Sequence, residues 1–244
     1  MFIGCCVDLS VNKLLTRGGI EIIAVFIGIS GGLWSEKQIE LKKTIKSEKI
    51  ALQSIREEFV SDSTALFGIV KSIENEQKNI EVLLNHIAED TTLSDSKLNS
   101  LIFEMIYFRY LTYDNSIYES LIKGAGKKII QVDSVSRAIS SIYEATYKHL
   151  GNIFQLQKDL LATKTYNSFV ESGGYLDTKR FSITQSLGEN QSKMFNEVFS
   201  NKKFVTQVAF HYDTNYFILN QYKWALKRVK KAIVEVDTYL SKSV

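Results

Sequence analysis

Between Leu41 and Ile87 the apolar residues recur at alternating spacings of four and three. This heptad pattern is sustained for more than six repeats and is typical of a long helix that buries one stripe of side chains. Its apolar positions are Leu41, Ile45, Leu52, Ile55, Phe59, Leu66, Ile69, Ile73, Ile80, Leu83 and Ile87. The remaining positions hold Glu48, Asp62 and Glu76. The pattern predicts one arm of a bundle within the chain; a parallel coiled coil between protomers is the alternative.

The 244-residue sequence contains no proline, the residue that most strongly breaks a helix, so its helices can run without interruption. Apolar residues at helical spacing continue over residues 98–108, 133–161, 184–200 and 201–241. The pair Gly173-Gly174 separates the second of these segments from the third. The sequence therefore predicts an all-α protein in which the long helix packs in an antiparallel helical bundle of four to five helices.

Residues 18–34 read GGIEIIAVFIGISGGLW and precede a highly charged stretch. A transmembrane helix needs about 20 mainly apolar residues, with a range of about 17–25. We expect a transmembrane helix at 18–34 that continues into the heptad-patterned helix. The predicted organisation is an N-terminal tail at 1–17, the transmembrane helix at 18–34, a long stalk or bundle helix at 35–90 and the rest of the bundle at 91–244. A cleaved signal peptide, with its cleavage site at Gly28-x-Ser30, and a buried core helix are the alternatives.

Four residues of this segment are candidates for a role in the membrane or in oligomer formation: Glu21, Gly28, Gly32 and Trp34. Gly28 and Gly32 have the small-xxx-small spacing that lets membrane helices approach closely. Trp34 is typical of a membrane interface. A charge inside a membrane helix is a functional hypothesis by default. The alternative is that Glu21, in the first turn, pairs with Arg17 four residues earlier.

The run GIEIIAVFIGI at 19–29, followed by Trp34, resembles the N-terminus of an uncharacterised family of single-pass bacterial membrane proteins that is frequent in Bacteroidota. Those proteins carry a Gly-Glu-Ile…Val-x-Ile-Gly-Ile transmembrane helix, then a Trp and a charged helical stretch. Residues 113–126 are similar to the family's Tyr-Glu-x-Leu-x-x-x-Gly segment, and residues 30–32 depart from the family pattern. The resemblance implies a membrane-anchored helical architecture and brings no established activity with it.

Composition and motifs argue against several classes of function. Thirty Lys and Arg residues stand against 27 Asp and Glu, without the basic excess that is usual in a nucleic-acid-binding domain. Cys5 and Cys6 are the only cysteines, and His86, His149 and His211 have no metal-ligand spacing. No P-loop or dinucleotide fingerprint is present. We therefore expect no enzymatic activity, no cofactor, no metal site and no nucleic-acid partner.

A run of basic residues interleaves with apolar ones near the C-terminal end of the sequence. These basic residues are Lys223, Lys227, Arg228, Lys230 and Lys231. Such a face can bind anionic lipid or an acidic partner, and a solvated helix face is the alternative.

These features favour a membrane-anchored, non-enzymatic helical module for sensing or partner recruitment. The expected partners are the lipid bilayer, a protein, and a second copy of the chain through the glycine face or the heptad helix. An oligomerising membrane effector, such as a pore or membrane-disrupting component of a toxin-like or defence system, is the alternative. We expect the bacterial inner (cytoplasmic) membrane as the location. The lysines that follow residue 34 favour a cytoplasmic domain, whereas a short basic N-terminal tail favours export.

Overall fold

The computed structural model describes residues 8–88, 91–107, 110–123, 130, 132–175 and 190–242, and of these it describes only the backbone for 8–24, 121–123 and 190–191. The helices are α1 (Asp8–Ile87), α2 (Asp95–Ile106), α3 (Ser116–Lys123), α4 (Asp133–Ser140), η1 (Ser141–Tyr147), α5 (Lys148–Leu156), η2 (Gln157–Thr163), α6 (Lys164–Glu171), α7 (Asn190–Ser200) and α8 (Lys202–Lys242), where η denotes a π-helix. Every regular element of the described residues is helical, which confirms the predicted all-α class.

The chain divides into two compact units, residues 1–51 and 52–244, and α1 contributes to both. In the first unit the ladder residues Leu41 and Ile45 are exposed, whereas Glu48 is buried. Among the residues whose side chains are described, no helix carries an apolar stretch long enough to cross a bilayer. The side chains of residues 18–24 are not described, so the role of the segment 18–34 as a transmembrane helix stays a prediction.

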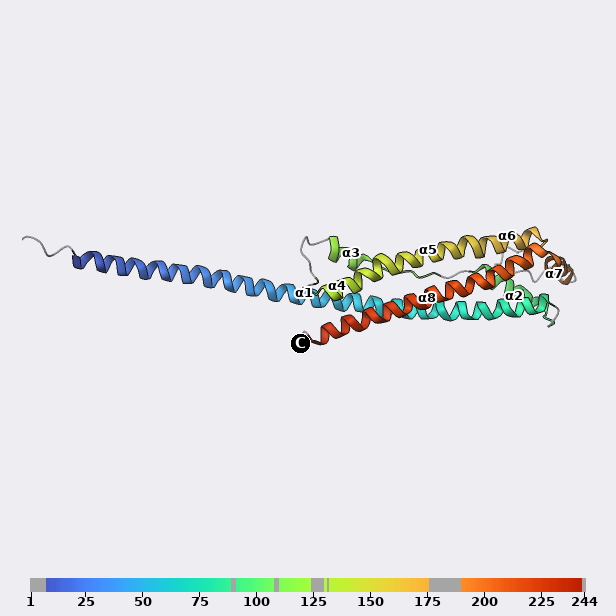
Figure 1. Cartoon of the computed structure of the whole chain (residues 1–244), viewed down its shortest axis with the longest axis horizontal. Coiled ribbons are helices and arrows are strands. Elements are labelled where there is room, and N and C mark those ends of the chain that lie inside the picture. The colour runs from blue at the N-terminus through green and yellow to red at the C-terminus, as the bar shows by residue number, and fades with distance from the viewer. Residues whose placement is uncertain are drawn as a thin grey trace, which may run out of the picture. The chain divides into compact units, whose positions relative to one another are not determined.

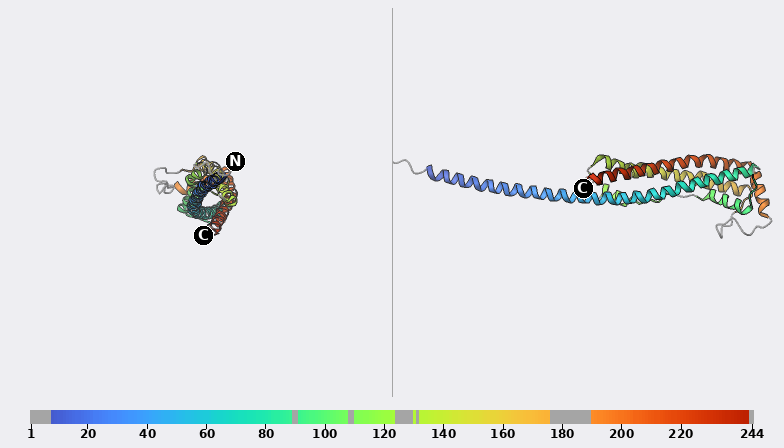
Figure 2. Two further views of the ribbon diagram at one scale, coloured as in Figure 1. Left: turned by 90° about the vertical axis from the view of Figure 1, so that its left-hand side faces the viewer. Right: turned by 90° about the horizontal axis from the view of Figure 1, so that it is seen from below.

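In the second unit three long helical segments lie side by side (Figures 1 and 2). They are α1 from residue 52 onward, α8, and the uninterrupted succession of α4, η1, α5, η2 and α6, here called the α4–α6 rod (residues 133–171). On α1, Arg56 bonds to Asp237 of α8 and Glu74 lies 2.9 Å from Lys223, so α1 and α8 are antiparallel.

The direction of the α4–α6 rod departs from the prediction that the helices of the bundle are antiparallel. Glu58 and Asp62 of α1 accept hydrogen bonds from Tyr143 and Tyr147 of the rod, so these two segments run parallel. The connection between α2 and α3 explains why the rod runs parallel to α1. Helix α2 packs against the C-terminal end of α1, whereas Tyr118 of α3 packs beside the N-terminal end of the rod. The chain between α2 and α3 therefore returns along the bundle before the rod begins.

Two apolar clusters make up the core. The first joins α1 from Leu52 to Ile73 with the rod and with α8 beyond Ile218. The second joins Ile80 and Leu83 with α2, α7 and the beginning of α8. The heptad ladder therefore predicts the buried stripe correctly from residue 52 to residue 83, and this part of it is buried within one chain.

The rod follows a different period from α1. Val135, Thr146, Gln157 and Ser168 are buried at intervals of eleven residues. An eleven-residue repeat corresponds to about 3.67 residues per turn, slightly more than the 3.6 of an α-helix. The wider turns of η1 and η2 supply additional residues per turn, because π-helices bond residue i to i+5. The two π segments thus keep one face of a long helix directed at the core.

Local signals set several helix ends. The Ser94 hydroxyl accepts a hydrogen bond of 3.3 Å from the backbone N–H of Lys97 and caps α2. The rod ends where Gly173 adopts a φ of +94°, in the region that favours glycine. At Gly174 an added Cβ would lie 2.5 Å from the ring of Phe169, which is fully buried. The predicted break at the glycine pair is thereby confirmed.

Gly174→Ala should lower the free energy of unfolding by about 1–3 kcal/mol, because the methyl group overpacks against the Phe169 ring. Urea denaturation followed by circular dichroism measures this loss. Gly151→Ala is the matched control, since a Cβ on Gly151 of α5 meets nothing within 4 Å. The control should gain about 0.5–1 kcal/mol from helix propensity. Equal effects of the two substitutions would contradict the close packing at Gly174.

Candidate functional site

The basic residues predicted as one face of α8 do not all have the same neighbours in the structure. Lys223 lies 2.9 Å from Glu74 of α1, which also pairs with Lys71 at 3.1 Å. Hydrogen bonds from Lys223 and Lys71 hold the pKa of Glu74 below its usual value. Lys223 is therefore engaged in an ion-pair cluster on α1 and α8, whereas Lys227, Arg228 and Lys231 line a groove beside the rod. Lys230 is exposed and does not join them.

The groove beside the rod is bounded by α4, η1 and α8, is here called the α4–α8 groove and has a volume of about 610 Å³. Its lining residues are Ser134, Arg137, Ala138, Ser141 and Ile142 on the rod, and Trp224, Lys227, Arg228, Lys231, Ala232 and Glu235 on α8. Four cationic side chains therefore face one hollow that contains a single carboxylate. The field of such a groove attracts anionic groups, because low-dielectric walls focus it.

Trp224 is held in a fixed position at the edge of this groove. The Arg228 guanidinium lies 4.8 Å from the centroid of the Trp224 ring, within the range of a cation–π contact. The His149 ring meets the indole edge-on at a centroid distance of 5.6 Å, and His149 Nε2 lies 2.9 Å from Gln221 Oε1. This support orders the aromatic ring and one arginine before any partner arrives, which lowers the entropy cost of binding.

Arg137 was not among the residues singled out from the sequence. It lies on α4, while Lys227, Arg228 and Lys231 lie on α8, and only the packing of the rod against α8 brings them together. Lys231 is 3.8 Å from Glu235, a long and exposed pair that is worth little. The polar spacing Ser134, Arg137, Ser141 along one helix face was the available signal, and nothing in it names the partner helix.

The four candidates from the predicted membrane segment lie in the first unit. Trp34 is exposed, and a Cβ added to Gly28 or Gly32 would meet nothing within 4 Å. The side chain of Glu21 lies outside the described part of the chain.

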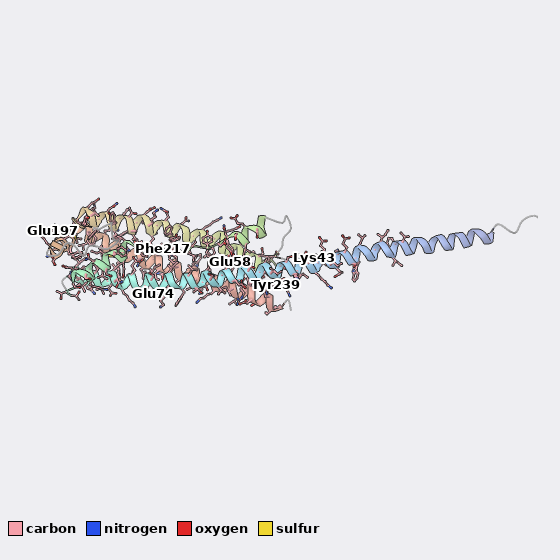
Figure 3. The ribbon with its side chains drawn as sticks, turned by 180° about the vertical axis from the view of Figure 1, so that it is seen from behind. Lys43, Glu58, Glu74, Glu197, Phe217 and Tyr239 are labelled. Atoms are coloured by element: carbon pink, nitrogen blue, oxygen red, sulfur yellow. The ribbon has the colours of Figure 1, made fainter. Side chains whose placement is uncertain are left out.

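A second polar group lies inside the bundle, between α1 and η1. Tyr143 donates a 2.6 Å hydrogen bond to Glu58, and Tyr147 donates one to Asp62, one turn further along both helices (Figure 3 labels Glu58). Burial raises the pKa of Glu58 and of Asp62, and the negative charge of Asp114 adds to this; the tyrosine hydrogen bonds act in the opposite direction. Burial and the adjoining carboxylates raise the pKa of both tyrosines. These phenols therefore stay protonated and act as hydrogen-bond donors.

One of the three histidines lies in the core of the bundle. His211 is fully buried, with Nε2 2.9 Å from Glu76 Oε1 and Nδ1 3.1 Å from Thr165 Oγ1. The described part of the chain contains no group of His, Cys, Asp and Glu side chains arranged to hold a metal ion.

The free energy of unfolding should fall as the pH rises from about 4, the usual pKa of a free carboxyl, through the raised folded-state pKa of Glu58 and Asp62. In this window the folded chain binds more protons than the unfolded one, so raising the pH favours unfolding. The double substitution Glu58→Gln with Asp62→Asn should flatten the fall, as measured by urea unfolding at a series of pH values.

Glu57→Gln serves as the control for this experiment, because Glu57 neighbours Glu58 on α1 and is exposed. It should leave the pH dependence as in the unaltered chain. An unchanged slope in the double variant would show that the two buried carboxylates do not set it.

Comparison of this chain with known protein families, with characterised proteins and with solved structures finds no match.

Proposed function

We propose that this chain is a membrane-anchored, non-enzymatic helical module that recruits a protein partner through an acidic segment bound in the α4–α8 groove. The observation that carries the proposal is the convergence of Arg137, Lys227, Arg228 and Lys231 from two helices on one hollow with a single carboxylate, Glu235. Electrostatic complementarity of this kind guides a partner to one surface and fixes its orientation.

The lining of the groove supports a protein segment as the occupant. The lining also includes Ile142 and Ala232, which are buried, and Trp224, which is 40% exposed. An apolar floor with a charged rim is the usual composition of a protein interface, where aromatic residues and arginine are enriched. Carboxylates spaced along a peptide can meet cations on both helices, and an apolar side chain of the same peptide can meet the floor.

The triple substitution Arg137→Ala, Lys227→Ala and Arg228→Ala should weaken binding of poly-L-glutamate by about tenfold or more, because each exposed charge contributes up to about 1 kcal/mol. Fluorescence anisotropy with a labelled polymer, repeated at rising salt concentration, measures the loss. The salt dependence should become shallower in the variant, since fewer charges are paired on binding.

Lys230→Ala is the matched control, because Lys230 is exposed on the same helix and does not line the groove. It should bind the polymer like the unaltered chain. If the triple variant loses affinity for vesicles of anionic phospholipid or for duplex DNA while its affinity for poly-L-glutamate is unchanged, the proposed protein partner is wrong.

The anchor of this module is the segment 18–34, and the proposal places it in the bacterial inner membrane with the bundle on the cytoplasmic side. Its support is the apolar run from Ile22 to Leu33 and the resemblance of residues 19–29 to a membrane-protein family. The side chains of Val25, Phe26 and Ile27 are all exposed in the isolated chain, as expected for residues that contact lipid.

Val25→Asp combined with Ile27→Asp should release the chain from membranes into the soluble fraction after alkaline carbonate extraction, because a charge in the bilayer centre costs about 2.5–3.5 kcal/mol per residue. Ile39→Asp, also an exposed apolar position of α1 but outside the segment, is the control and should leave the chain in the pellet. Complete extraction of the unaltered chain would contradict the anchor.

An oligomerising membrane effector remains the second proposal. Its support is that an added Cβ on Gly28, Gly31 or Gly32 would meet nothing within 4 Å, which leaves room for the close approach of another helix. Leakage of a trapped dye from vesicles that contain the reconstituted chain separates this proposal from the recruitment module, which leaves vesicles sealed.

A further inference from the structure

A row of large aromatic side chains on α8 is exposed to solvent. Phe210, Phe217 and Trp224 follow one another at intervals of seven residues and are 43%, 47% and 40% exposed. Figure 3 labels Phe217, the middle one. Residues seven apart on an α-helix lie two turns apart on the same side, so the three rings form one stripe, here called the aromatic stripe. Such a row differs from the scattered single apolar residues that are normal on a protein surface.

The aromatic stripe borders the contact between α8 and the α4–α6 rod. Gln207, three residues before Phe210, donates a hydrogen bond of 3.3 Å to a backbone carbonyl of η2. Gln221, three residues before Trp224, has its Oε1 2.9 Å from His149 Nε2 of the rod. Residues three apart are neighbours on a helix surface, so the stripe lies at the outer edge of this contact. A helix laid along the stripe can therefore meet α8 and the rod together.

Both ends of the aromatic stripe are basic. Trp224 lines the α4–α8 groove, with its four cationic side chains. Phe210 lines a second hollow of about 490 Å³, here called the α6–α8 hollow. The residues that line this hollow are Lys164 on α6, and Lys202, Lys203, Thr206, Gln207 and Phe210 on α8. Its lining therefore holds three lysines and no carboxylate, although Lys203 also pairs with Glu171 beside it.

The surface between these two ends carries little net charge. From residue 204 to residue 222 of α8, Asp213 is the only Asp, Glu, Lys or Arg. On the rod between the two hollows the exposed charges balance, since Glu144 and Asp159 stand against Lys148 and Lys158. The linings of the two hollows together hold seven Lys or Arg side chains, four and three, and the single carboxylate of Glu235. The surface is thus aromatic in the middle and cationic at both ends.

We propose that the aromatic stripe and the two hollows together bind one amphipathic helix of a protein partner, with its apolar side chains on the stripe and carboxylates near both of its ends. The inference rests on the proposed function, because it gives the acidic segment of that proposal a conformation and a second basic contact. Lys203 and Lys231 are 28 residues apart on α8, about 42 Å at 1.5 Å per residue. The partner helix accordingly has about eight turns.

The spacing of the stripe favours a helix over an extended segment. Its rings recur every two turns, about 10.5 Å along α8. A helix that packs alongside presents side chains at the same seven-residue period, as in helix-in-groove recognition. An extended segment presents side chains on one side about every 6.6 Å, which does not match this spacing.

The charge of the surface favours a partner other than a second copy of α1. Residues 35–51 of α1 carry five lysines and three glutamates, so their net charge has the same sign as that of the two hollows. Like charges placed opposite each other oppose binding. A helix with acidic ends complements both hollows.

Two synthetic 28-residue peptides test the proposal by fluorescence anisotropy with the full-length chain. Both are alanine-based, with three glutamates at each end and four leucines in the middle. In the first peptide the leucines follow the heptad spacing and share one face of the helix, and in the second the same leucines are spread around it. We expect the first peptide to bind at least about tenfold more tightly, because only it can cover the stripe.

The outcomes separate this inference from the proposed function. Equal affinity of the two peptides, or binding of poly-L-glutamate without binding of either peptide, would overturn the amphipathic helix and leave the acidic partner in place. Absence of binding of the peptides and of poly-L-glutamate alike would overturn both.

The place of binding can be read from Trp224. Because Trp34 is the only other tryptophan, Trp34→Phe leaves Trp224 as the sole indole of the chain. Its emission should shift to shorter wavelength when the first peptide shields the ring from water. Tight binding with unshifted emission would place the peptide elsewhere and refute the site.

Phe217→Ser tests the middle of the stripe, because Phe217 lines neither hollow and is half-exposed. It should weaken binding of the first peptide by about tenfold and leave the affinity for poly-L-glutamate unchanged. Tyr216→Ser is the matched control, since Tyr216 is the adjacent aromatic residue of α8, is 62% exposed and points about 100° away around the helix. Unchanged peptide affinity in Phe217→Ser would refute the proposal.

Lys164→Ala combined with Lys202→Ala tests the α6–α8 hollow in the same way. The pair should weaken binding of the first peptide by about fivefold or more, because one acidic end of the peptide loses its cations. Lys193→Ala, an exposed lysine of α7 outside both linings, is the control. If Phe217→Ser and the lysine pair reduce binding to vesicles of anionic phospholipid while peptide binding is unchanged, the surface binds a membrane and the proposed helix is wrong.

Discussion

Buried acidic residues on α1 impose the strongest constraint on this bundle. Asp62 and Glu76 occupy ladder positions that would otherwise be apolar, two heptads apart. A buried carboxylate is strongly destabilising unless a donor meets it, so each of them requires a partner at one height of the bundle. Tyr147 of the rod meets Asp62, and His211 of α8 meets Glu76. Sliding either partner helix by one turn would break such a contact, so the polar pairs fix the register that the apolar ladder leaves open.

The need of the buried Glu76 carboxylate for a hydrogen-bond donor also divides the core into two parts. Because Glu76, His211 and Thr165 form a continuous polar contact across three segments, the apolar residues on either side gather into separate clusters. The short helices α2 and α7 cover only the second cluster, and α3 packs only on the first. The short elements thus act as covers for two separate cores, and the three long segments connect those cores.

Sequence periodicity predicts what is local in this architecture. The heptad ladder identifies buried residues of α1 such as Leu52, Phe59 and Leu83, and the break at Gly173 follows from the glycine pair. Contacts between distant segments are not predicted. Nothing in the sequence pairs Glu76 with a histidine 135 residues away, and nothing places Arg137 beside Lys227. The parallel course of the rod was also missed, because it depends on the connection between α2 and α3, which has no periodic signal of its own.

The α4–α6 rod shows where structural and functional demands differ. At one position of its eleven-residue repeat stand Val135, Thr146, Gln157 and Ser168, so three of the four buried residues are polar. The Thr146 hydroxyl is satisfied within the helix by the Ser141 carbonyl, at 3.1 Å. Gln157 has no such local partner for its oxygen, and an apolar residue would fill the position at lower cost. Local rules are most often broken where a site needs the exception. Ser168 Oγ is likewise enclosed without a partner, so two of the three polar residues at this repeat position break the rule, and Gln157 lines a pocket of about 480 Å³ between α1, the end of α2 and η2.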